Sequence, residues 1–356
     1  MSRNPCKIIG LGATLMLLTA CAQNSIHLDL AAPDKVKVPQ TASSYQGTLP
    51  CADCPGIDMH LDLLPDGRYF LQEVYQDRSP EPLQSFGRWQ LDGTRLILQQ
   101  PEQELIFFAT RSGGWLKADT EGRPIQSQLN YSLQPVPWQP LKLEGPIQGM
   151  LLYFADSAIL SECRTGALYP IEMNNTWLEL ERSYLSSRSG AGSYLYLEAQ
   201  GQQIWTQPEE GPARHHLHLQ QVQNTTANAT CPVSPAAIEG QSWQLSAWSP
   251  LALDLPDLTQ FQAEQLPQLT LTGQQMSGFT GCNSMAGPAL FEGNRLNLGP
   301  VASTRRYCHD TAELESQFLP LLEQVTYTGL EGNAWVWYDA DMRRLASFQA
   351  QTPETP

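Results

Sequence analysis

Basic residues are scarce in this chain of 356 residues. Lysine and arginine together number 21, against 36 aspartates and glutamates, so the formal net charge is −15 at pH 7. No lysine- or arginine-rich patch or stripe occurs along the sequence. Nucleic acid is therefore not an expected partner, because proteins bind phosphate backbones through clustered positive charge.

Catalytic motifs are missing as well. The six histidines are scattered, and no HExxH sequence is present. The segment 281–284 lacks the G-x-S-x-G spacing of a nucleophile elbow. Cys308 and His309 place a thiol beside a base, but a disulfide-bonded Cys308 before a helix start accounts for the pair better. We therefore expect a protein without enzymatic activity.

A long apolar run occurs only at the N-terminus. Residues 8–18 follow a basic start and end in Leu-Thr-Ala-Cys21. The run is short for a membrane span and has the size of a signal-peptide core. Because the final four residues look like a bacterial lipobox, we expect a lipoprotein signal peptide over residues 1–20 and lipidation of Cys21. An ordinary secretory signal cut near Ala20, which leaves a soluble periplasmic protein, is the alternative.

Lipidation of Cys21 implies a membrane partner. Several acyl chains anchor a protein stably, whereas a single chain binds only marginally. Alanine rather than aspartate follows Cys21, and the usual sorting rule then predicts the outer membrane, with the protein facing the periplasm. Residues 21–45 are polar and contain proline, which predicts a flexible lipidated tether.

The other cysteines suit an oxidising compartment. With Cys6 in the signal peptide and Cys21 lipidated, six remain, and an even number predicts three disulfides. Fifteen pairings are possible. Because the cysteines fall two to a segment, sequential pairing is favoured: Cys51–Cys54, Cys163–Cys231 and Cys282–Cys308.

Cys51-Ala-Asp-Cys54 opens a strand, because residues 57–63 alternate between apolar and polar side chains. A thioredoxin-type pair instead opens a helix, whose N-terminus lowers the thiol pKa. A thiol–disulfide enzyme is thus disfavoured. A structural or redox-responsive disulfide and a Cu(I) site on Cys51 and Cys54 both remain open. Met59 and His60 cannot both join such a site, since neighbouring strand residues face opposite sides.

A second metal-like cluster lies at His215, His216 and His218. If this segment is a strand, His216 and His218 share a face and together offer two nitrogen ligands to a divalent ion. A solvated loop or strand edge is the simpler interpretation, and the sequence leaves both open.

Three modules are expected, because the chain is long for one compact domain. Proline-rich and polar breaks fall at 135–146 and 223–238. In the first module, hairpin signals at 65–67 and 92–93 separate short apolar runs, which predicts a small closed antiparallel barrel.

One helix is readable in the last module. Its apolar face is formed by Leu314, Phe318, Leu321, Leu322 and Val325. We expect Asp310 and Glu313 to form a capping box at its start, and Pro320 to kink or split it. A shorter helix is expected at 178–185.

Particular motifs resemble the NlpE lipoprotein family. Residues 49–57 (LPCADCPGI), 66–69, 86–89 and 122–131 are similar to its N-terminal domain, and 155–158, 163–166 and 180–185 to its second domain. The resemblance implies a lipocalin-like barrel over 46–135, with the CxxC pair at one end, and an OB-like barrel over 141–232. It also implies a Cys163–Cys231 disulfide.

The third module resembles a META domain of the HslJ type over residues 238–350. The motifs that carry this resemblance are residues 240–245, 277–283, 304–308 and 315–318. The expected fold is therefore mainly β and multidomain, with a lipocalin-like small β-barrel, an OB-like β-barrel and a C-terminal α+β META domain.

The NlpE resemblance implies a function in envelope-stress sensing and signalling through the Cpx pathway, and in copper homeostasis. An envelope-stress sensor kinase and the lipoprotein sorting machinery are the implied partners. We hypothesise that lipidation and disulfide state are the signals such a protein reports. The alternative is a periplasmic soft-metal protein that binds copper through Cys51 and Cys54; no other cofactor is expected.

Replacing Cys21 tests the anchor. Cys21→Ser removes the thiol that accepts lipid, so the chain should no longer fractionate with the outer membrane. Membrane fractionation and mass spectrometry of the N-terminus measure this. A variant that stays in the outer-membrane fraction would show that the lipobox interpretation is wrong.

Overall fold

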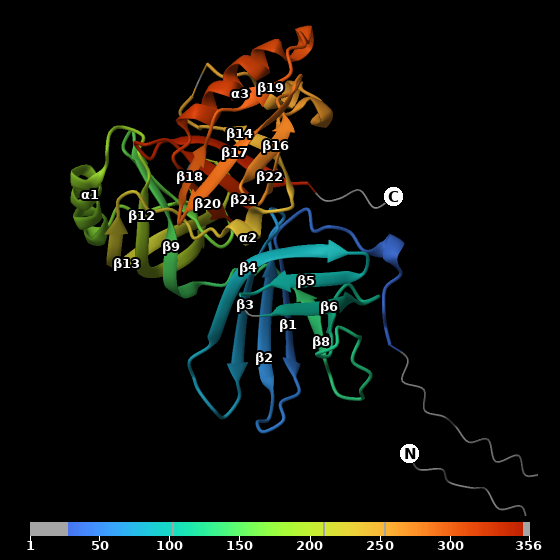
Figure 1. Ribbon diagram of the computed structural model, residues 1–356. Coiled ribbons are helices and arrows are strands. Elements are labelled where there is room, and N and C mark those ends of the chain that lie inside the picture. The colour runs from blue at the N-terminus through green and yellow to red at the C-terminus, as the bar shows by residue number, and fades with distance from the viewer. Residues whose placement is uncertain (1–27, 102, 209–210, 253, 352–356) are drawn as a thin grey trace, which may run out of the picture.

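The computed structural model describes residues 28–101, 103–208, 211–252 and 254–351 (Figure 1). Three antiparallel bodies follow one another along the chain: a closed barrel, a five-stranded sheet and a nine-stranded sheet. The mainly β, multidomain fold class is thereby confirmed. Cys21 and the expected signal peptide lie outside the described residues. Within the described ranges, no helix has the length and apolar character needed to cross a membrane.

The barrel domain consists of eight strands and closes by pairing of β1 with β8. The strands are β1 (Ser43–Leu49), β2 (Ile57–Leu63), β3 (Arg68–Tyr75), β4 (Leu83–Asp92), β5 (Arg95–Gln99), β6 (Glu104–Ala109), β7 (Trp115–Lys117) and β8 (Ser132–Val136). Gly67 and Gly93 have positive φ of 84° and 59° in the turns after β2 and β4, a conformation that glycine adopts without strain. Both expected hairpins are confirmed.

The middle domain is an OB-like barrel of five strands in the order β11-β10-β9-β12-β13. They are β9 (Leu143–Phe154), β10 (Ser157–Glu162), β11 (Leu168–Pro170), β12 (Leu195–Thr206) and β13 (Arg214–Thr226). A parallel bridge between Ile171 and Leu217 joins the two edges of the sheet. The expected helix is α1 (Asn175–Ser187); the Asn174 side chain caps it by accepting a hydrogen bond from the Trp177 N–H.

The C-terminal domain is a nine-stranded sheet that also pairs β16 with β17. Its strands are β14 (Ser242–Trp248), β15 (Gln268–Thr272), β16 (Gln275–Phe279), β17 (Ser284–Glu292), β18 (Arg295–Leu298), β19 (Ala302–Ser303), β20 (Tyr327–Glu331), β21 (Ala334–Tyr338) and β22 (Arg344–Ala350). Its helices are α2 (Pro235–Ile238), α3 (Ala312–Gln324) and the 3-10 turns η2 (Leu258–Gln260), η3 (Ala263–Gln265) and η4 (His309–Thr311). The expected apolar face of α3 is buried against the core that also contains Trp335 and Phe348.

The start of α3 differs from the expectation. Asp310 belongs to the turn η4, and Thr311 is the N-cap residue without a side-chain cap hydrogen bond. The expected capping box is therefore wrong, because η4 extends the chain into the helix one turn earlier. Pro320 lies inside the helix without splitting it.

The expected tether is partly folded onto the barrel. The Ala31 N–H donates to the Ala109 carbonyl at 2.8 Å, and Leu30 forms a bridge with Thr110. Ala31 and Val36, which flank η1 (Pro33–Lys35), pack against the barrel core. The prediction of a flexible tether up to residue 45 is thus wrong for residues 30, 31 and 36, which contact the barrel, and for residues 43–45, which belong to β1.

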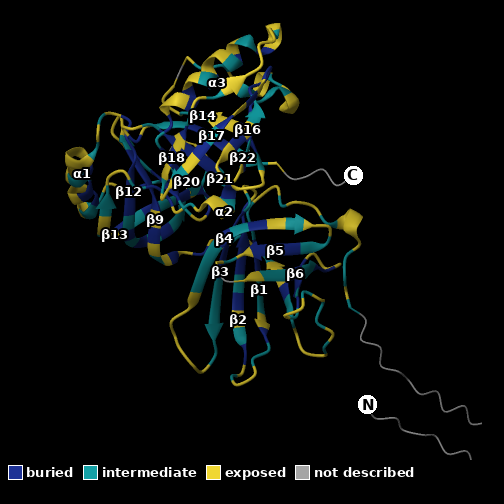
Figure 2. Cartoon of the chain, in the orientation of Figure 1, coloured by how far each residue is buried: buried dark blue, intermediate teal, exposed yellow. Residues whose placement is uncertain are grey.

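The barrel domain meets the middle domain at the end of the barrel that carries the β2–β3 turn (Figure 1). Leu64 and Phe70 of the barrel form one buried cluster with Leu141 and Leu143. Beside this cluster the Arg68 guanidinium pairs with Asp66 at 2.6 Å and lies 5.2 Å from the centre of the Tyr169 ring. Dark-blue segments in Figure 2 mark the buried parts of these strands.

His215 of β13 is buried in this junction. Its ring stacks on Phe70 with the ring centres 4.3 Å apart and meets the edge of Trp205 at 4.9 Å. The Nδ1 atom has no hydrogen-bond partner among the described residues. Burial lowers the pKa of His215 to about 3, and the positive charge of Arg68 contributes in the same direction.

This histidine makes the junction sensitive to acid. Between pH 6.5 and about 3 the unfolded chain binds a proton at His215 that the folded chain does not, so stability falls as the pH falls through this window. His215→Phe keeps an aromatic ring on Phe70 but cannot titrate. We expect urea unfolding between pH 7 and pH 4 to show a shallower loss of stability in this variant, by up to about 1.4 kcal/mol per pH unit.

His309→Phe is the matched control. His309 is exposed, with 89% of its side chain accessible, so this variant should keep the pH dependence of the unmodified protein. An unchanged slope in His215→Phe would contradict the assignment.

Candidate functional site

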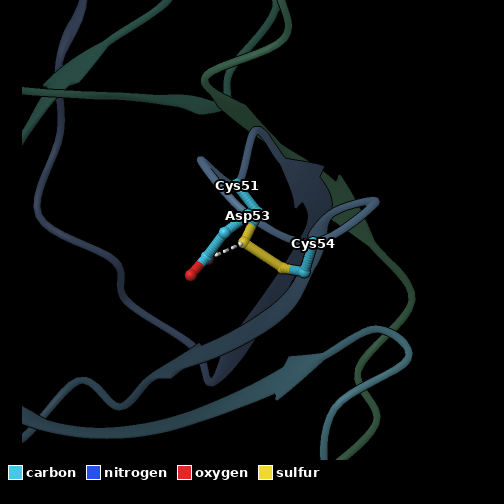
Figure 3. A group of neighbouring side chains, drawn as sticks. All are labelled: Cys51, Asp53 and Cys54. Atoms are coloured by element: carbon cyan, nitrogen blue, oxygen red, sulfur yellow. Dashed lines mark hydrogen bonds between the residues drawn. A yellow bond between two sulfur atoms is a disulfide. The ribbon is translucent and has the colours of Figure 1, made fainter.

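The Cys51–Cys54 loop joins β1 to β2 at the free end of the barrel domain. The two cysteines form a disulfide with a Cα–Cα distance of 5.2 Å. Cys51 Sγ lies 3.6 Å from Asp53 Oδ1 (Figure 3), and the Arg78 guanidinium pairs with the Asp53 carboxylate. A side chain at Gly56 would come within 2.6 Å of Thr48. A larger residue at this position would therefore require the Thr48 side chain to move.

The surroundings of this loop agree with the prediction that the cysteine pair precedes a strand. The pair precedes a strand and not a helix, so no helix N-terminus is available to stabilise a thiolate. Met59 is buried in the barrel. His60 lies on the other face and contacts Gln46 and Asp62. The two side chains diverge, as expected of strand neighbours.

The loop does not fit copper in its oxidised form. The donor atoms of Cys51, Asp53 and Cys54 lie within 4.8 Å of one another. However, the two sulfurs are bonded to each other and carry no thiolate charge, and Asp53 is a hard oxygen ligand paired with Arg78. A Cu(I) ion prefers thiolate or thioether sulfur, so binding here requires reduction of the disulfide first.

A tight turn, residues 162–166, joins β10 to β11 in the middle domain. The buried Glu162 carboxylate accepts hydrogen bonds from the Arg164 N–H at 2.9 Å and the Thr165 N–H at 2.9 Å, and from the Thr165 hydroxyl at 2.6 Å. Burial raises the pKa of Glu162, and these hydrogen bonds oppose the shift. The carboxylate thereby fixes the shape of the turn.

The 162–166 turn contacts the barrel domain on one side. Arg88 of β4 donates to the Thr165 carbonyl at 2.6 Å. In the other direction, Arg164 donates to the Phe86 carbonyl at 3.3 Å, and its guanidinium stacks 4.7 Å from the centre of the Phe86 ring. Two arginines, one from each domain, thus link the barrel to the turn.

The same turn contacts the C-terminal domain on its other side. The Gly332 N–H donates to the Cys163 carbonyl at 2.8 Å. A Cβ atom at Gly166 would lie 2.6 Å from the Glu331 carbonyl, and one at Gly332 would lie 2.4 Å from the Thr165 carbonyl. The backbones approach so closely that both positions require glycine.

The Cys163–Cys231 disulfide fastens this junction. It joins residues 68 positions apart, and Cys231 is fully buried in a cluster shared by the middle and C-terminal domains. The neighbouring Thr230 hydroxyl donates to the Thr328 carbonyl of β20 at 2.7 Å. The bridge therefore holds the end of the middle domain against the 162–166 turn and against β20 at the same time.

A buried ion pair completes the contact between these two domains. Glu331 pairs with Arg344 and also accepts hydrogen bonds from Ser161 and from Tyr338. Arg344 lies 4.8 Å from the ring centre of Tyr194 in the middle domain. Burial alone would lower the pKa of Arg344, but the Glu331 charge outweighs it and raises that pKa well above its usual value. Such a pair is stable only while its partners stay in place.

An open pocket of about 530 Å³ lies where the three domains meet. It is lined by residues of each domain: Phe86 of the barrel, Cys163 and Arg164 of the middle domain, and Leu330 of the C-terminal domain. Cys163 of the junction disulfide thus borders an open pocket.

The third disulfide, Cys282–Cys308, lies within the C-terminal domain. Asn283 beside it accepts a hydrogen bond from the Arg306 N–H at 2.7 Å and donates to the Arg306 carbonyl at 2.9 Å. The bridge and this amide hold the loop before η4. All three pairings follow the order that the grouping of the cysteines along the chain favoured.

The junction residues could not be recognised from the sequence as members of one site. No pattern along the chain brings together the charged residues of the junction, which are Arg88, Glu162, Glu331 and Arg344. Gly166 and Gly332 were the residues in the sequence that could have pointed to this contact. In the structure each has a positive φ and lies against another backbone. His216 and His218, the second cluster noted in the sequence, share a strand face and both approach Glu172.

Comparisons with known proteins match all three domains. Residues 45–128 match the NlpE N-terminal domain, residues 143–232 the NlpE C-terminal OB domain and residues 236–352 the META domain. Lipoprotein NlpE of Escherichia coli is 32% identical over 195 residues, which cover 53% of this chain and 79% of that protein. The 17 kDa lipoprotein of Treponema pallidum is 34% identical over 104 residues, which cover 28% of this chain and 67% of that protein.

A solved structure is similar to part of this chain. It is the crystal structure of the Cpx pathway activator NlpE from Escherichia coli, which is 29% identical with a TM-score of 0.26. The match covers 54% of this chain and 99% of that chain.

Proposed function

The chain belongs to the NlpE family of lipoproteins, and on this premise we propose that it is a lipid-anchored monitor of envelope stress that acts without catalysis. Its place is the periplasmic face of the outer membrane, where Cys21 carries the lipid. Its partners are the lipoprotein sorting machinery and an envelope-stress sensor kinase. The Escherichia coli relative is described as an activator of the Cpx pathway, and we assign the same pathway to this chain.

The position of the Cys163–Cys231 disulfide carries the proposal. The bridge lies at the 162–166 turn, which contacts both neighbouring domains. Closing a loop of this length contributes about 4 kcal/mol in the chain-entropy model. A typical domain is stable by about 5–15 kcal/mol. A chain in which the Cys163–Cys231 disulfide has not formed therefore loses a large share of its stability at this junction.

Two defects of the envelope would then produce one signal. Failed lipidation keeps the chain from leaving the inner membrane, and failed oxidation leaves Cys163 and Cys231 as separate thiols. Copper enters the same scheme when it reacts with thiols before they pair, which links the protein to copper homeostasis without a dedicated site.

The second candidate function is soft-metal binding at Cys51 and Cys54. Its support is the cluster of three donor residues in the exposed loop. This loop lies at the end of the barrel opposite the middle domain (Figure 1). An ion there would act far from the junction and only after reduction of the disulfide.

Replacing single cysteines separates the two functions. Cys163→Ala opens the junction bridge, and we expect a several-fold rise in a Cpx reporter at equal protein level, because a loss of a few kcal/mol strongly raises the opened population. The double variant Cys51→Ala/Cys54→Ala is the control and should leave the reporter near the level of the unmodified protein.

The opposite pattern would support soft-metal binding at Cys51 and Cys54. A reporter that responds only to the loss of Cys51 and Cys54, and in proportion to added copper, would contradict the disulfide account.

A further inference from the structure

Two neighbouring pockets share the side chains of Phe86, Pro146 and Arg164. One is the pocket of about 530 Å³ where the three domains meet. The other has a volume of about 150 Å³ and is lined by residues of β4, β9 and β12. Because they share these walls, the two pockets form one groove along residues 143–148, which we call the β9 groove. Its larger part alone has the size of a small-ligand site, about 300–1,000 Å³.

One edge of β9 has no strand partner along this groove. The strand pairs with β12 over residues 143–151, but with β10 only over residues 149–154. At the beginning of the open edge the Gln84 side chain takes the place of a strand. Its Nε2 donates to the Lys142 carbonyl at 3.1 Å, and its Oε1 accepts from the Glu144 N–H at 3.0 Å. A glutamine amide thus already pairs with a peptide backbone in this groove.

Gln203 of β12 brings a second amide to the groove. It lines the smaller pocket and is only 4% exposed. Its Oε1 atom has no hydrogen-bond partner among the described residues. Buried polar atoms without a partner are uncommon in folded proteins, and an amide both donates and accepts hydrogen bonds. The group that complements Gln203 best is therefore another amide, which is the repeating unit of a peptide backbone.

Arg164 supplies a positive charge between the two pockets. Its guanidinium stacks on the Phe86 ring and donates to the Phe86 carbonyl. Glu162, the acidic residue of the larger pocket, is only 4% exposed, and its carboxylate accepts hydrogen bonds from the turn instead. A carboxylate from a ligand is the group that such a guanidinium binds best.

The smaller pocket carries the opposite charge. Glu144 lines it, and its carboxylate accepts hydrogen bonds from Gln202 at 2.8 Å and Gln220 at 3.2 Å. These hydrogen bonds lower the pKa of Glu144, so it is ionised at neutral pH. An acidic group of a ligand is therefore directed to Arg164, and an uncharged amide to Gln203.

We propose that the β9 groove binds an extended peptide segment of a partner protein, with a backbone amide on Gln203 and an acidic side chain paired with Arg164. Main-chain hydrogen bonds along the open edge of β9 supply affinity, and the carboxylate supplies specificity. Because residues of all three domains line the groove, the partner recognises the assembled molecule and not a single domain. The proposal does not rest on the envelope-signalling function, since it involves neither the lipid anchor nor the redox state of the cysteines.

Selection from a peptide library tests the groove. The full-length oxidised protein in detergent is incubated with N-acetylated tetrapeptide amides that have glutamate at the third position and any residue except cysteine elsewhere. Mass spectrometry identifies the retained peptides, and calorimetry should show that they bind saturably at one peptide per chain. Replacing the glutamate of a retained peptide by glutamine should weaken binding about 3- to 10-fold, because an ion pair becomes a neutral hydrogen bond.

Three variants locate the binding in the groove. Arg164→Gln should bind the glutamate and glutamine peptides equally, and Gln203→Leu should weaken both about 3- to 10-fold because it cannot pair with an amide. Gln148→Trp places a large side chain at an exposed position of the larger pocket and should abolish binding. Arg182→Gln and Gln221→Leu change exposed residues outside the groove and should bind like the unmodified protein.

Circular dichroism and thermal unfolding without peptide verify that each variant is folded. Failure to retain any peptide, equal affinity of the unmodified protein for the glutamate and glutamine peptides, or unchanged binding in Gln203→Leu and Gln148→Trp would overturn the proposal. Free glutamate or acetate that binds as tightly as the peptides would also overturn it and indicate a site for small anions. None of these outcomes affects the reporter experiment, which measures signalling.

Discussion

The contact of one short turn of the middle domain with both neighbouring domains is the constraint on which the arrangement of this molecule depends. The 162–166 turn receives Arg88 from the barrel and Gly332 from the C-terminal domain. Its own Cys163 is bonded to Cys231. Backbones approach so closely at this point that glycine is required on both sides of the contact with the C-terminal domain. Opening this disulfide would therefore affect the contact with the barrel domain and the contact with the C-terminal domain together.

The two cysteine pairs of the NlpE-like domains have different physical settings. Cys51 and Cys54 close a short loop at the free end of the barrel domain, so we expect its opening to have local consequences. Cys163 and Cys231 close a long loop in a buried interface beside the Glu331–Arg344 pair. Separating the partners of a buried ion pair is costly because each charge loses its compensation. Opening the second pair therefore disturbs the contacts between domains, which is the physical basis of the role proposed for it.

Features set by neighbouring residues were predictable from the sequence, and features set by distant contacts were not. The Asp-Gly turns and the apolar face of α3 depend on local chemistry and periodicity, and both were expected. The capping box failed because η4 inserts an additional turn before α3. The bridge between Leu30 and Thr110, and the contacts of Glu331 with Ser161 and of Arg344 with Tyr194 across the junction, depend on how the strands fold back. His216 and His218 were noticed as a pair, but Glu172, 46 residues from His218, could not be.

Hydrogen exchange measured by mass spectrometry tests the central claim most directly. The comparison is between the oxidised protein and the Cys163→Ala/Cys231→Ala double variant in the same buffer. If the disulfide holds the junction, exchange should rise at residues 161–166 and in β20, while the barrel strands β1 to β3 keep their protection. Unchanged exchange at the junction, or an equal rise throughout the chain, would contradict the view that this bridge controls the contact between the domains.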